Sequence, residues 1–154
     1  HTIGNAMVRA SCILQLASAP PGEPLNAAEI ARREGLSCPY VEKLLWTLKK
    51  AGFTKSHRGV KGGYVLARPP EQISLGDVER ALGGLWTTED ICDRYTGQRR
   101  TCIHDKDCRL RPVWKGITQY VVGVMDGIPI SQILGKETLV ELSLGKTFRL
   151  PAQV

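Results

Sequence analysis

The stretch between residues 26 and 52 most constrains what this chain can fold into, because it holds two short amphipathic helical patterns separated by a glycine turn. Asn26 is a suitable N-cap for the first pattern, with Glu29 three residues later as in a capping box. Gly35 stands where a helix commonly ends, and Ser37 is placed to cap the second pattern. This order of helix, short turn and helix predicts a helix-turn-helix motif. Its expected core consists of Ala27, Ile30, Ala31, Leu36, Val41, Leu44 and Leu45.

The sequence that follows, FTKSHRGVKGGYVLA, predicts a β-hairpin. Two short strands are expected near residues 53–56 and 63–66, and the tip between them is rich in glycine, arginine and lysine. A hairpin in this place is the wing of a winged helix-turn-helix, so the expected fold is mainly α with a small β-hairpin wing.

The net charge of +6 is placed entirely in the first part of the chain. Residues 1–68 hold ten basic and four acidic side chains, whereas the remainder holds eleven of each. Such asymmetry indicates a polyanionic partner, and with a helix-turn-helix the partner is expected to be double-stranded DNA. The start of the second helix would meet base edges and the wing would reach phosphates or the minor groove. The candidate DNA contacts are Ser37, Tyr40, Lys43, His57, Arg58 and Lys61.

Three of the five cysteines follow this region with the spacing C-x9-C-x5-C. Cys92, Cys102 and Cys108 lie in a loop without a periodic apolar pattern, so that packing does not explain them. Thiolates ligate soft metals and iron–sulfur clusters. His104 lies between two of the cysteines and would complete a Cys3His set, which zinc accepts. The odd number of cysteines is typical of ligands or sensors in a cytoplasmic protein, and Cys12 reads as a buried, inert thiol.

Helical patterns account for most of the rest. Residues 5–18 and 73–84 predict helices before and after the winged motif. Residues 111–128 predict a longer helix whose apolar side needs a partner, for which a second copy of the chain is the economical choice. We expect its dimer face to be Ile117, Tyr120, Val121 and Val124. The expected organisation is a winged helix-turn-helix (1–84), a cysteine-rich loop (85–110), a dimerisation helix with a short following helix (111–135) and a weakly patterned tail (136–154).

Several classes of protein fit poorly. The longest apolar runs are too short to cross a bilayer, and no export signal opens the chain. The glycines of HRGVKGG do not lead into a helix, as a phosphate-cradling loop must. No arrangement of serine, histidine and aspartate indicates catalysis. The sequence therefore predicts a cytoplasmic protein that is neither an enzyme nor a membrane protein.

The segment SCPYVEKL, the wing RGVKGGY, the cysteine triplet and a long helix opening with a tryptophan together resemble the winged-helix regulators typified by IscR, NsrR, RirA and CymR. The resemblance covers roughly residues 6–135 and implies a homodimeric transcription regulator that binds a two-fold-related operator. Many such regulators sense iron, redox state or nitric oxide through an iron–sulfur cluster. By this resemblance, Cys92, Cys102 and Cys108 would hold a 2Fe–2S or 4Fe–4S cluster.

The resemblance leaves the fourth ligand open. IscR-like members offer a histidine three residues after the last cysteine, and here that position is Arg111, which cannot ligate because it stays protonated. His104 is one candidate. The alternative is a zinc-bound or cluster-free regulator controlled by thiol oxidation or by a protein partner.

Overall fold

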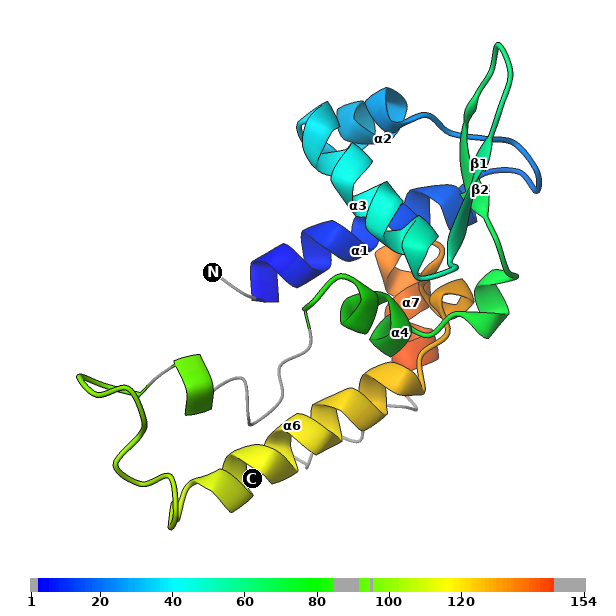
Figure 1. Cartoon of the computed structure of the whole chain (residues 1–154). Helices are drawn as coiled ribbons and strands as arrows, with labels where there is room; N and C mark the ends of the chain where they lie inside the picture. The colour runs from blue at the N-terminus through cyan, green and yellow to red at the C-terminus, as the bar shows by residue number, and fades with distance from the viewer. Residues whose placement is uncertain (1–2, 85–91, 95, 146–154) are drawn as a thin grey trace.

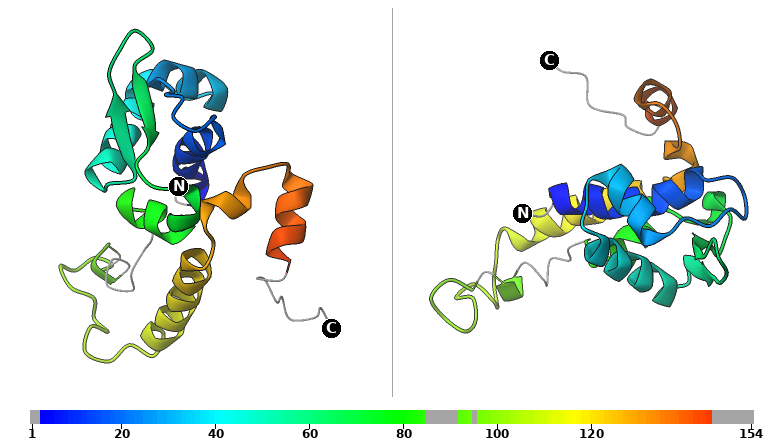
Figure 2. Two further views of the ribbon diagram at one scale, coloured as in Figure 1. Left: turned by 90° about the vertical axis from the view of Figure 1, so that its right-hand side faces the viewer. Right: turned by 90° about the horizontal axis from the view of Figure 1, so that it is seen from above.

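The computed structural model describes residues 3–84, 92–94 and 96–145. A helical head, formed mainly by residues 3–84, carries a two-stranded wing on one side, and a long helix leads away from it (Figures 1 and 2). In chain order the elements are α1 (Ile3–Ser18), α2 (Ala27–Glu34), α3 (Cys38–Lys50), β1 (Thr54–His57), β2 (Gly63–Leu66), η1 (Pro70–Gln72), α4 (Leu75–Ala81), α6 (Arg111–Asp126), η2 (Ile130–Ile133) and α7 (Glu137–Leu144).

The helix ends follow the capping residues of the sequence. The Asn26 side chain accepts a hydrogen bond from the backbone N–H of Glu29 at 2.8 Å, and Gly35 ends α2 with a φ of +65°. The carboxylate of Glu29, however, pairs with Arg32 and Arg33, each at 2.7 Å. The reciprocal capping box lies instead in α4, where Ser74 and Asp77 cap each other's backbone N–H groups.

One hydrophobic core joins α1, α2, α3, α4 and η2. The expected helix-turn-helix core is buried except for Leu36, which is half-buried because it lies in the turn. Residues from outside that motif complete the core, and the fully buried ones include Ile13, Ile73, Val78 and Ile130. The head therefore depends on long-range packing between the first helix, the helix-turn-helix and the segment that follows α6.

The wing is fixed to the helical head by its second strand. β1 and β2 pair antiparallel, with Thr54 opposite Leu66 and His57 opposite Gly63. Tyr64 also exchanges backbone hydrogen bonds with Leu25, of 2.8 and 3.1 Å, just before α2. At Gly63 a Cβ atom would collide with the carbonyl of Leu25, so only glycine permits this close approach.

The long helix α6 is anchored to the head at its C-terminal end. Leu75 donates to the carbonyl of Ile128 at 2.8 Å, and Arg80 forms a 2.7 Å salt bridge with Asp126. The other end of α6 leads from the segment that contains the cysteines (Figure 1). Beyond η2, α7 is a helix that the weak pattern of the tail does not predict. Within the described part of the chain, no helix has the length and apolarity needed to span a bilayer.

Candidate nucleic-acid interface and cysteine loop

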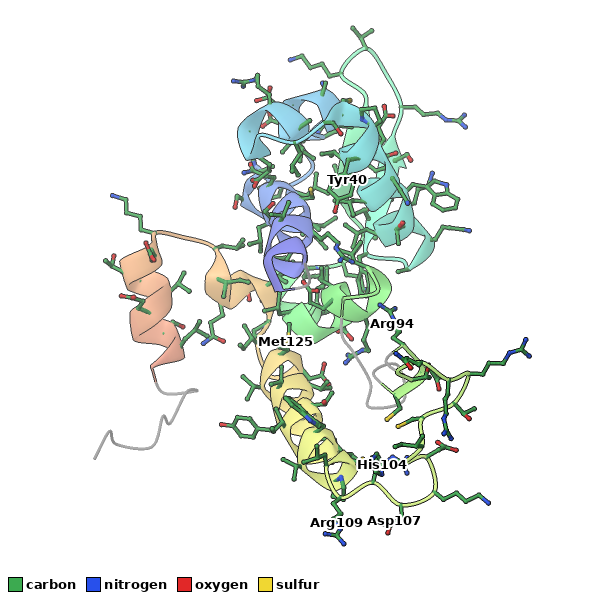
Figure 3. All side chains as sticks on the ribbon, turned by 90° about the vertical axis from the view of Figure 1, so that its left-hand side faces the viewer. Tyr40, Arg94, His104, Asp107, Arg109 and Met125 are labelled. Atoms are coloured by element: carbon green, nitrogen blue, oxygen red, sulfur yellow. The ribbon has the colours of Figure 1, made fainter. Side chains whose placement is uncertain are left out.

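The outer side of α3 presents the polar residues expected to face DNA. Ser37 and Lys43 are exposed, whereas Tyr40 is half-buried because it packs against the core (Figure 3). Ser37 occupies the N-cap position, but its hydroxyl makes no capping hydrogen bond. The opposite side of α3 is buried through Val41, Leu44, Leu45 and Leu48, so the orientation of the helix is set by the core.

The wing packs its first strand against this helix and carries a basic tip. His57, Arg58 and Lys61 are all exposed, as the sequence pattern predicts. The ammonium of Lys49 donates to the hydroxyl of Ser56 at 2.7 Å and connects the end of α3 to β1. The tip extends beyond the helices on the side of the head that carries α2 and α3 (Figure 1). The structure thus brings both groups of candidate DNA contacts onto one end of the head.

The structure does not bring all the predicted ligands of the cysteine loop together. Cys92, Cys102 and Cys108 are all free and half-buried, and His104 is exposed. Among the residues that the structure describes, no group of three histidine, cysteine, aspartate or glutamate side chains is arranged to hold a metal ion. The donor set suits a soft metal by its chemistry, but the geometry does not bring the predicted ligands together.

Arg111 has a structural role in this loop. Its guanidinium donates to the carbonyl of Asp105 at 2.6 Å and lies 3.7 Å from the carboxylate of the same residue. The backbone N–H of Asp105 in turn donates to the carbonyl of Cys102 at 3.1 Å. The first turn of α6 therefore holds the turn that begins at Cys102, and His104, Asp107 and Arg109 lie around this end of the helix (Figure 3).

The other two cysteines are separate from the loop. Cys12 is fully buried in the head, and burial raises the pKa of its thiol to about 11. It therefore remains a protonated thiol at neutral pH, which agrees with the expected inert role. Cys38 is half-buried in the first turn of α3, where its sulfur lies 4.0 Å from a carboxylate oxygen of Glu42.

The outward face of α6 is apolar. Val124 is half-buried, and the other apolar residues of this face are 45% to 65% exposed. Those exposed residues are Val113, Trp114, Ile117, Tyr120 and Val121. A contiguous apolar helix face of this kind is typical of an interaction surface. Its role as the dimer face stays a prediction.

Sequence reasoning missed a buried carboxylate at the end of the head. Glu79 of α4 is 2% exposed, and its Oε2 has no hydrogen-bond partner among the described residues. Burial raises the pKa of Glu79, and this effect outweighs the opposing attraction of Arg9. A glutamate within the short pattern of residues 73–84 looks like a surface residue, so no signal in the sequence marks it.

We expect Glu79→Gln to stabilise the protein in a pH-dependent way. The folded chain holds the proton of Glu79 more tightly than the unfolded chain does, so Glu79 reduces stability as the pH rises from about 4.3 through the folded pKa. Glutamine removes this pH-dependent loss, because its amide does not ionise. Thermal denaturation of both proteins from pH 4 to pH 8 should show a gap that widens with pH, and a constant gap would contradict the prediction.

A basic helix-turn-helix with a basic wing defines a winged-helix DNA-binding regulator. The chain belongs to the Rrf2 family, described as an iron-dependent transcriptional regulator, which matches residues 5–136.

Individual relatives agree with this family. HTH-type transcriptional regulator IscR of Cereibacter sphaeroides is 29% identical over 128 residues, which cover 80% of this chain and 79% of that one. The solved structure of T. potens IscR is similar, with a TM-score of 0.68, 30% identity and coverage of 87% of this chain and 85% of that chain. CymR, the global cysteine regulator of B. subtilis, gives a TM-score of 0.67 at 27% identity, covering 87% and 95% of the two chains.

These similarities confirm two predictions from the sequence. The chain is of the IscR and CymR type, and its fold is the mainly helical winged helix of those structures. Its relatives are named as regulators of transcription, so the chain is a DNA-binding regulator and not an enzyme.

Proposed function

We propose that the protein is a cytoplasmic, homodimeric regulator that senses iron, redox state or nitric oxide through an iron–sulfur cluster. The observation that carries the proposal is that three free, half-buried thiols lie in the chain between the head and α6, the helix with the exposed apolar face. In a dimer, a ligand-binding loop in this position can change the arrangement of the two DNA-binding heads when the cluster is gained or lost. The iron-dependent description of the family supports the same conclusion.

Cys92, Cys102 and Cys108 would supply the cluster ligands. The described positions do not form a three-donor group, so binding would require these thiols to move toward one another. Such a cluster supplies a centre that reacts with oxidants and small gases. The protein would contribute the thiolates and the Arg111 contact that holds the Cys102 turn on α6. The fourth ligand is proposed to be His104 or a group from outside the loop.

DNA would be bound by two heads related by two-fold symmetry. Ser37, Tyr40 and Lys43 would lie in the major groove, and the wing residues His57, Arg58 and Lys61 would contact phosphates or the minor groove. A symmetric dimer presents two equal heads, so the operator is expected to have two related half-sites. Footprinting should show protection of both half-sites by the dimer.

Lys61→Ala should weaken binding to every duplex by a similar factor. The exposed ammonium at the wing tip would neutralise about one phosphate, so the slope of log affinity against log salt should fall by about one unit. Titrations of selected and random duplexes at several salt concentrations measure this slope. Lys136→Ala, which removes an exposed lysine just before α7, is the matched control and should leave the slope unchanged. An unchanged slope in Lys61→Ala would show that the wing tip does not contact the DNA.

Visible absorbance and metal content test the cluster directly. Protein purified without oxygen should be brown and contain iron and sulfide. A colourless protein with one zinc per chain would support the second candidate, in which Cys92, Cys102, His104 and Cys108 form a tetrahedral site. A colourless, metal-free protein whose DNA binding responds to oxidants would instead support control by thiol oxidation.

A further inference from the structure

Trp46 lies in the middle of the outward face of α3. The helix buries Val41, Leu44, Leu45 and Leu48 on its inner side, and the helical repeat places Trp46 on the opposite side. Its side chain is 54% exposed. Lys43 lies one turn before it on the same face, and the ammonium of Lys50, one turn after it, lies 4.1 Å from the ring centroid.

An exposed aromatic residue alone is ordinary on a protein surface, but Trp46 lies on the helix that is expected to enter the major groove. The indole projects from the same outward face as Lys43. The helix that carries both residues, α3, is the second helix of the helix-turn-helix and begins after Ser37. Lys49, which is also exposed, adds positive charge in the last turn of α3. Glu42 is the one acidic side chain of α3 and lies one turn before Trp46, so the three lysines leave this end of the helix with net positive charge, which suits a nucleic-acid duplex.

The chemistry of the indole favours a base over a phosphate. The indole N–H can donate only one hydrogen bond to a phosphate oxygen and the rest of the ring is apolar, while the flanking lysines already provide cations for phosphates. Its apolar edge can pack against the C5 methyl of thymine, which is the apolar group on the major-groove edge of a base pair. The cation–π contact with Lys50 would hold the indole in one orientation on the helix.

We propose that Trp46 reads a thymine methyl in each half-site of the operator. This proposal rests on the proposed orientation of α3 in the major groove. It adds Trp46 to the candidate DNA contacts that the amino-acid sequence indicates. Trp46 supplies the apolar contact, while Lys43 and Lys50 supply contacts to the backbone on either side of it.

Selection from a pool of random-sequence duplexes tests the proposal. The full chain, Trp46→Ala and Trp46→Phe are each used to enrich binding sites, and the enriched sequences are compared. The wild-type protein should select thymine at one position of each half-site, Trp46→Phe should retain this preference, and Trp46→Ala should lose it alone. Trp46 is exposed, so thermal denaturation should show that the variants remain folded.

Replacing that thymine by deoxyuridine removes only the methyl group. The change should lower wild-type affinity about fourfold, the factor that one buried methyl-sized group gives. It should leave the affinity of Trp46→Ala unchanged. Equal sensitivity of both proteins to deoxyuridine, or identical enriched sequences, would overturn the proposal.

Lys43→Ala separates failure of this inference from failure of the proposed DNA interface. If Lys43→Ala weakens binding but Trp46→Ala leaves the selected sequence unchanged, α3 is in the groove and Trp46 does not read a base. If neither variant changes binding, α3 is not the reading helix, and the inference and the proposed interface are both wrong. A uniform loss of affinity in Trp46→Ala would make the indole a backbone contact and would also overturn the proposal.

Discussion

Replacing Cys102 by serine is expected to yield a folded, dimeric protein without iron or visible absorbance. Cys102 opens the turn that Arg111 and Asp105 hold against α6, so its thiolate is central in the proposed ligand set. If the cluster biases the arrangement of the two heads, its loss should change operator affinity by about 5- to 150-fold. Binding to random DNA should change much less, because phosphate contacts do not require correctly spaced heads.

Iron analysis, absorbance and titrations with both kinds of duplex measure these effects. Cys38→Ser is the matched control for metal content, because its thiol is equally half-buried but lies in α3. This control should keep its iron. The sign of the change in Cys102→Ser tells which form of the protein binds the operator. Iron retained in Cys102→Ser, or iron lost with operator affinity unchanged, would falsify the proposed sensor.

Val121→Glu is expected to convert the dimer into a monomer. Val121 is 45% exposed in the single chain and lies in the middle of the apolar face of α6. Burying an unpaired carboxylate between two such faces costs several kcal/mol, and every 1.4 kcal/mol weakens association about tenfold. Sedimentation at micromolar concentration should show the monomer, and the affinity for a two-fold operator should fall.

Gln119→Glu is the matched control for Val121→Glu. It adds the same charge to the same helix, but the helical repeat places Gln119 on the opposite side from Ile117 and Val121. This variant should remain a dimer. If Val121→Glu also remains dimeric, the apolar face of α6 is not the dimer interface.

The head could be predicted from the sequence because local rules and long-range packing agree there. Asn26 and Gly35 mark the two ends of α2 by the hydrogen bonds that they can make. The spacing of Val41 and Leu44 marks the buried side of α3. These features depend on neighbours within one or two turns, which a sequence pattern records directly.

Other features depend on contacts that are distant in sequence. Gly63 is needed because β2 approaches Leu25, and the buried position of Glu79 follows from packing that its helix does not reveal. α7 has a weak apolar pattern, so its periodicity gives little signal. The arrangement of Cys92, Cys102 and Cys108 depends on loop geometry, which spacing along the chain does not determine. Their role as ligands stays a prediction.

None of the described residues between 92 and 127 is buried, and the core is closed by α1 to α4 with Ile128 and Ile130. The cysteine segment therefore lies outside the core, between α4 and α6 in the chain, and the chain re-enters the same core after α6. Lengthening such a segment costs little, because loop-closure entropy grows only slowly with length. If this segment is the proposed sensor, its length and its ligands can change over evolution while the head keeps its own stability. Loss of the metal should leave the melting temperature of the head nearly unchanged.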